Sequence, residues 1–82
     1  MSTIQAPALY DDLLDLLAEG ADKSRLLSFR LSEEKQARLD QLLERNRQGA
    51  LTKEQSAELD AFEHFEHLVR LLKSRLLQKR RG

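Results

Sequence analysis

The stretch that decides the fold runs from residue 46 to residue 60 and reads NRQGALTKEQSAELD. It holds a signal for the end of one helix and a signal for the start of the next. Gly49 is expected to end the first helix, because only glycine enters the left-handed C′ conformation without a Cβ clash. Thr52 is expected to cap the second helix, with Gln55 three residues later completing a capping box. The stretch therefore predicts a tight turn between two helices.

The helix before this turn is predicted over 33–48. Ser32 supplies a capping hydroxyl at its start, and Glu33 and Glu34 follow in the first turn, where acids favour the helix dipole. Glu34 is also expected to pair with Arg38, four residues later on the outer face of the same helix.

The helix after the turn is predicted over 53–79 and is much longer than its predecessor. At 1.5 Å per residue the two helices span roughly 40 Å and roughly 24 Å. In an antiparallel hairpin, the shorter helix then covers only the 59–69 half of the longer one. The half at 71–77 needs another cover, for which the candidates are the N-terminal helices, a second copy of the chain or another protein.

The long helix also carries apolar residues at spacings of 3, 4, 3 and 4, which is the pattern of a coiled-coil seam. The residues of this seam are Phe62, Phe65, Val69, Leu72 and Leu76. The cations that flank it are Arg70, Lys73 and Arg75. We predict that the seam and its basic flank contact a partner.

Two shorter helical segments are predicted before the hairpin. The first runs over 8–19 and ends at Gly20, and the second runs over 23–29 behind a cap at Asp22. Leucine and other good helix formers dominate the whole chain, and β-branched residues are few. The predicted fold class is therefore all-α, an antiparallel helical hairpin with one or two short N-terminal helices packed on it.

Composition limits the number of domains and indicates the environment of the protein. Residues 1–82 are expected to form a single small helical domain, with frayed ends at 1–6 and 80–82. The chain has no cysteine, which removes disulfides, thiolate metal sites and a cysteine nucleophile. No apolar run approaches the roughly 20 residues that span a bilayer, and no secretory signal is visible. We therefore expect a soluble, cytoplasmic protein with no membrane partner.

Charge is balanced overall but is arranged in blocks. The net charge is zero, yet residues 68–82 hold six cations and no acid. Cations at the end of a helix favour its dipole, and they also suit an acidic protein partner. Binding to nucleic-acid phosphates is less favoured, because no aromatic residue in this block offers a surface for base stacking.

The order of residues along most of the chain resembles a family of short helical bacterial proteins that is common in cyanobacteria. The residues that carry the resemblance include Tyr10, Leu13, Leu26, Phe29, Arg30, Ser32, Arg38, Leu42, Glu58, Leu59, His67 and Leu71. Its most specific part is Asn46-Arg47-x-Gly49-x-Leu51-Thr52. Members look like antitoxin-type components of addiction modules, encoded beside a small toxin or nuclease. The resemblance implies a small helical partner protein and carries no active site.

One cluster contains residue types that can bind a metal ion. His64 and His67 share a side of the long helix, and Asp60 and Glu63 lie four residues before them. These residues form neither a Glu-x-x-His nor a His-Glu-x-x-His motif. The favoured interpretation is two structural histidines beside a buried Phe65, paired with the acids, rather than a metal corner or a pH-sensitive interface.

No motif of catalysis is present. The serines lack a Gly-x-Ser-x-Gly elbow, and no glycine-rich phosphate loop occurs. We predict a protein without enzymatic activity, cofactor or metal. Its expected function is to neutralise or scaffold a cognate protein, in the manner of an antitoxin. The alternatives are a homodimeric structural adaptor and a nucleic-acid-binding accessory.

Overall fold

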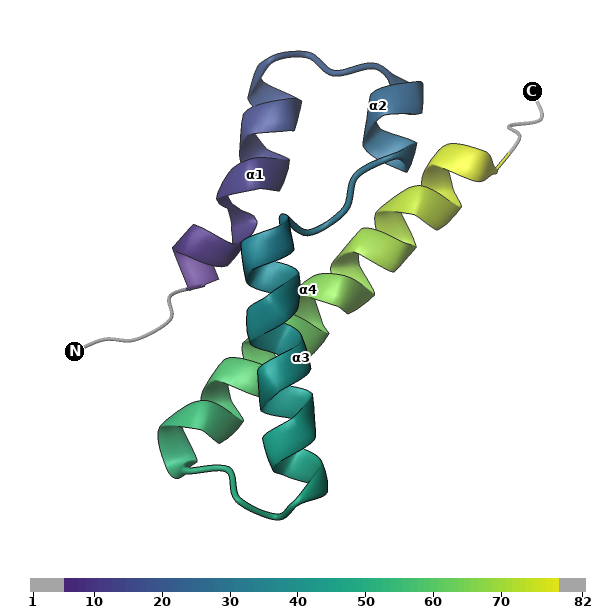
Figure 1. Ribbon diagram of the computed structural model, residues 1–82. Helices are drawn as coiled ribbons and strands as arrows, with labels where there is room; N and C mark the ends of the chain where they lie inside the picture. Colours follow the sequence, from purple (N-terminus) through teal and green to yellow (C-terminus); the bar gives the residue numbers. More distant parts are fainter. Residues whose placement is uncertain (1–5, 79–82) are drawn as a thin grey trace.

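The computed structural model describes residues 6–78, and within that range the chain is all-α (Figure 1). Its helices are α1 (Ala6–Ala18), α2 (Lys23–Leu27), α3 (Glu33–Arg47) and α4 (Lys53–Leu77). The predicted all-α class and the hairpin are confirmed. The termini predicted to be frayed lie outside the described residues, except for Ala6, which begins α1. Residue 79, the predicted end of the last helix, also lies outside them.

The turn between α3 and α4 is built as its sequence predicts. Gly49 has a φ of 68°, and the Ala50 amide donates to the Arg45 carbonyl at 2.9 Å, which closes a Schellman motif at the end of α3. The Thr52 hydroxyl accepts from the Gln55 amide at 3.0 Å, and the Gln55 side chain accepts from the Thr52 amide at 3.0 Å. The reciprocal capping box fixes the first turn of α4.

The other predicted cap and stop residues are confirmed by the same kind of contact, although the helix predicted over 8–19 spans Ala6–Ala18 and the one predicted over 23–29 ends at Leu27. Gly20 has a φ of 78° after α1, and the Ala21 amide donates to the Leu16 carbonyl at 3.0 Å. Asp22 caps α2 by accepting from the Arg25 amide at 2.9 Å. Ser32 caps α3 by accepting from the Lys35 amide at 3.2 Å.

The two N-terminal helices fold back onto the long helix. α3 packs antiparallel against the first half of α4, while α1 and α2 lie beside its later turns (Figure 1). The described chain is elongated, with principal extents of 50 × 23 × 18 Å. The predicted uneven hairpin is therefore present, and the chain's own N-terminal helices supply part of the cover for the later half of α4.

One core joins all four helices. It contains nine buried hydrophobic residues: Leu9, Leu13, Leu26, Phe29, Leu39, Leu42, Leu59, Phe62 and Phe65. Phe65 lies at its centre and is 1% exposed. The ring of Tyr10 meets it edge-on at a centroid distance of 4.8 Å, and the ring of Phe29 does so at 6.0 Å. α4 is therefore the element against which the other helices pack.

An ion pair ties the hairpin together on its surface. Arg38 of α3 donates from Nε and Nη2 to the two carboxylate oxygens of Glu58 of α4, at 2.7 and 2.8 Å. The predicted pairing of Arg38 with Glu34 is wrong, because Glu58 offers a bidentate partner that is only 15% exposed. The hydrogen bonding with Glu58 raises the pKa of Arg38, desolvation lowers it, and the charge of Glu58 raises it further.

Candidate functional site

The predicted partner seam is divided by the fold between the core and the surface. Phe62 and Phe65 are 3% and 1% exposed, so both side chains belong to the core and neither offers contact area to another molecule. Val69, Leu72 and Leu76 are half-buried and pack against the same core. The physical reason is that α1 and α2 pack on α4, which the length of α3 alone does not reveal.

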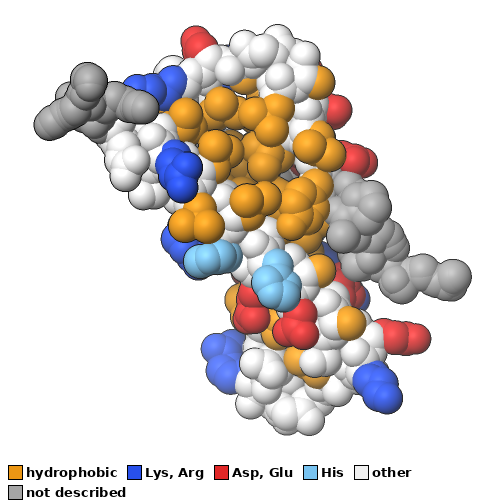
Figure 2. Space-filling view, turned by 180° about the vertical axis from the view of Figure 1, so that it is seen from behind, with side chains coloured by type: hydrophobic (Ala, Val, Ile, Leu, Met, Phe, Trp, Pro, Cys, Tyr) orange, Lys and Arg blue, Asp and Glu red, His pale blue; other side chains and the backbone are white. Residues whose placement is uncertain are grey.

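A different set of leucines is exposed. Leu68 and Leu71 on α4 are 41% and 52% exposed, and Leu14 and Leu17 on α1 are 52% and 47% exposed. Each pair is spaced three residues apart, so its members lie on one side of their helix. Figure 2 shows hydrophobic side chains forming a broad surface over these two helices on the face opposite the view of Figure 1. We call Leu14, Leu17, Leu68 and Leu71 the apolar face.

Both histidines are exposed, and they lie at the border of this hydrophobic surface (Figure 2). Asp60, Glu63, His64 and His67 do not form a metal-binding group, and no other set of three or more such side chains does so within residues 6–78. The predicted pairing of the histidines with these acids is not formed, since no ion pair in the described chain includes a histidine. Phe65 is buried beside them, as predicted.

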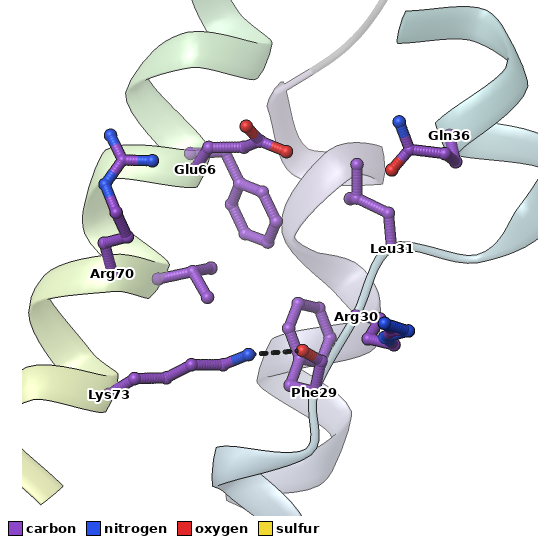
Figure 3. A pocket seen from close by; sticks show the side chains of 9 residues that line it. Phe29, Arg30, Leu31, Gln36, Glu66, Arg70 and Lys73 are labelled. Atoms are coloured by element: carbon purple, nitrogen blue, oxygen red, sulfur yellow. Dashed lines mark hydrogen bonds between the residues drawn. The ribbon is translucent and has the colours of Figure 1, made fainter. Parts of the chain in front are cut away.

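A pocket of about 300 Å³ opens on another side of α4, where the link between α2 and α3 approaches the long helix (Figure 3). Its lining residues are Phe29, Arg30, Leu31, Gln36, Phe65, Glu66, Val69, Arg70 and Lys73. Glu66, Arg70 and Lys73 are spaced by four and three residues, so α4 presents them along one side. The pocket therefore forms only when the link between α2 and α3 lies against α4, which is distant from it in the sequence.

The basic flank predicted for the seam is divided as well. Arg70 and Lys73 line the pocket, whereas Arg75 is exposed and is not among its lining residues. Lys73 is half-buried, and its ammonium donates to the Phe29 carbonyl at 2.7 Å, which ties the link to α4 (Figure 3). The remaining cations of the C-terminal block, at 79–81, lie outside the described residues.

Sequence reasoning missed the pocket residues on the link and on α3, namely Arg30, Leu31 and Gln36. No local pattern marks them, because they meet α4 only through the path of the link between α2 and α3. The fold thus places two separate features on α4: the apolar face on one side and a charged pocket on another.

Comparisons with protein-family models, with curated proteins and with solved structures found no match to this chain. Within residues 6–78, none of the helices combines the length and the hydropathy that crossing a membrane requires.

Proposed function

We propose that this protein is a non-enzymatic helical interaction module that binds a cognate protein through the apolar face. The observation that supports the proposal most directly is the joint exposure of Leu14 and Leu17 on α1 with Leu68 and Leu71 on α4. Scattered exposed leucines are ordinary, but a continuous apolar surface over two packed helices is typical of a docking site (Figure 2).

Removal of exposed apolar surface from water would favour this docking. Burying an exposed leucine completely contributes about 1.5–3 kcal/mol, and these leucines are each already about half covered. A partner that covers the four of them gains several kcal/mol before any polar contact is formed. Leucines spaced by three residues on a helix suit a complementary apolar groove, which is the helix-in-groove mode of recognition.

We further propose that the module acts as an antitoxin-like neutraliser, with a small toxin or nuclease as its cognate protein. The resemblance to antitoxin-type proteins supports this proposal. The different roles of the buried and the exposed side chains support it as well. Its buried side chains maintain the fold, and its exposed leucines leave contact area for another protein.

The test is co-expression with the protein encoded by the neighbouring gene. We expect that protein to arrest growth alone, the wild-type chain to relieve the arrest, and the variant L68N/L71N to fail. The matched control is L43N/L77N, which changes two exposed leucines outside the apolar face, at 42% and 68% exposure. A neighbour that is harmless alone, or equal relief by both double variants, would contradict the proposal.

A homodimeric adaptor is the second candidate, and the distribution of charge along α4 favours it. On the exposed side of α4, Asp60 and Glu63 precede the leucines Leu68 and Leu71 and Arg75 follows them, so a copy packed antiparallel over these leucines would place opposite charges together. Light scattering over a concentration series tests it. A mass that doubles in the wild type and stays monomeric in L68N/L71N supports the dimer, and a strict monomer at high concentration excludes it.

A further inference from the structure

The two long edges of the apolar face carry opposite charges. Figure 2 shows acidic side chains along the edge that α1 forms, and Lys or Arg side chains along the opposite edge, away from α1. The hydrophobic surface lies between these edges and extends over both helices. A molecule that docks on the four leucines therefore meets negative charge on one flank and positive charge on the other.

The acidic edge includes the outer side of α1. Asp11 and Asp15 are both exposed and lie four residues apart, and Asp11 lies one turn before Leu14. The ring of Tyr10 meets the ring of Phe65 at a centroid distance of 4.8 Å, so α1 turns its Tyr10 side towards α4 and its two acids outward. No ion pair within residues 6–78 includes either acid, so the fold in this range does not neutralise them.

The basic edge includes the later turns of α4. Between residues 71 and 78 the chain holds two cations, Lys73 and Arg75, and no acid. Arg75 is exposed and lies four residues after Leu71, so both side chains lie on one side of the helix. Towards its C-terminal end α4 diverges from α1 (Figure 1), which places these turns on the edge away from α1.

The shape of the apolar face suits a helix. α1 and α4 each contribute two leucines spaced by three residues, and a third helix packs over two such neighbouring helices in a bundle. An extended strand would gain no backbone hydrogen bonds here, because the backbone groups of both helices are bonded within each helix. α1 has 13 residues and is roughly 20 Å long, which matches a docked helix of about fourteen residues.

We propose that the apolar face binds an amphipathic helix that carries an apolar stripe, cations along one flank of the stripe and acids along the other. The cations lie beside Asp11 and Asp15, and the acids lie beside Arg75. Turning the helix end for end would exchange its flanks and bring like charges together, so the helix binds in one direction. The proposal rests on the proposed function, since it describes the segment that the cognate protein presents to the apolar face.

The experiment uses two synthetic peptides of about fourteen residues and identical composition, both with leucines spaced by three and four residues. In the first peptide, lysines follow one flank of the leucine stripe and glutamates follow the other. In the second peptide the two flanks are exchanged. Both have uncharged ends and a nitroxide spin label at the N-terminal end. The full protein chain is labelled for amide NMR, so that broadening of its signals locates the N-terminal end of the bound peptide.

We expect the two peptides to bind in opposite directions. One should broaden the signals around His64, at one end of the apolar face, and the other should broaden the signals around Arg75, at the other end. For each peptide the favoured direction should exceed the other about fivefold at low salt, because several exposed charge pairs change together. About 0.5 M salt should reduce this preference, since it screens exposed charges.

The variant D11N/D15N tests the acidic edge and should lower the preference to about twofold. The matched control is D40N/E44Q, which removes two exposed acids of the same spacing from α3. The control should leave both the direction and the preference as they are in the wild type. An equal effect of the two double variants would overturn the proposal, because it would show a dependence on net charge alone.

Two further results would overturn it. The first is the same direction for both peptides, or equal populations of the two directions, while L68N/L71N abolishes binding. The apolar face would then dock a helix, as the proposed function requires, without distinguishing its flanks. The second is no binding of either peptide to the folded protein, or binding that L68N/L71N does not weaken. That result would show that the apolar face does not dock a helix, and the co-expression test would then decide the proposed function separately.

Discussion

Arg38 and Glu58 form a bidentate ion pair across the hairpin, with N···O distances of 2.7 and 2.8 Å between residues twenty positions apart in the sequence. Glu58 is 15% exposed and Arg38 is 40% exposed, so the pair is only partly screened by water. The contact lies between α3 and α4 and holds the two helices at the level of their packed leucines.

A double-mutant cycle with R38M and E58Q should give a coupling energy of about 1 kcal/mol in urea unfolding, because the pair is bidentate and partly buried. The control is the pair between Arg47 and Glu44, whose side chains are 72% and 53% exposed. Its cycle should give a coupling energy near zero. Equal coupling in the two cycles would show that burial does not decide the strength of these pairs.

Phe65 should be the most sensitive position of the core. F65A removes the ring that Tyr10 and Phe29 contact, and should cost about 3–5 kcal/mol, a large part of the stability of a small domain. F65L should cost about 1 kcal/mol. The measurement is urea unfolding followed by circular dichroism, and L71A, at a 52% exposed position, should change stability by no more than about 0.5 kcal/mol. A larger loss in L71A than in F65L would contradict this packing.

Replacement of Gly49 should destabilise the protein because of its backbone conformation alone. Its φ is 68°, and a Cβ built at this position meets no atom within 4 Å. G49A should therefore cost about 1 kcal/mol through left-handed strain, and G49N should cost less, because asparagine tolerates this conformation. Thermal unfolding measures both variants. An alanine variant as stable as the wild type would show that the turn rearranges.

Lys73 should hold the link between α2 and α3 against α4. K73M leaves the Phe29 carbonyl without its donor and should cost about 1–2 kcal/mol, whereas K73R keeps a donor and should cost less. Amide hydrogen exchange provides a second readout, since K73M should raise exchange around Leu31 more than around Leu42. Unchanged exchange at the link in K73M would show that the contact does not restrain it.

Local signals explain why the hairpin was predictable from the sequence. Gly49, Thr52 and Gln55 act within a few residues of one another, so their contacts follow from chain geometry without knowledge of the rest of the fold. The same holds for the caps at Asp22 and Ser32. The boundaries of α3 and α4 consequently lie within one or two residues of their predicted positions.

Long-range packing explains what was missed. The spacing of Phe62 and Phe65 is the same whether the seam meets a partner or the chain's own N-terminal helices, and the structure places both in the core. Glu34 lies four residues before Arg38, at the spacing of an ion pair within one helix. The stronger partner, Glu58, comes from the other helix of the hairpin. The pocket was likewise hidden, because Phe29 and Lys73 meet only once the link is in place.

Calorimetric titration of the purified chain with the protein encoded by the neighbouring gene tests the role of the apolar face most directly. The wild type and L43N/L77N should bind alike, with a negative heat-capacity change from buried apolar surface. L68N/L71N should bind at least about a hundredfold more weakly, because two leucine contacts are lost. Absence of binding by the wild type, or equal affinity of the two double variants, would contradict the proposed docking surface.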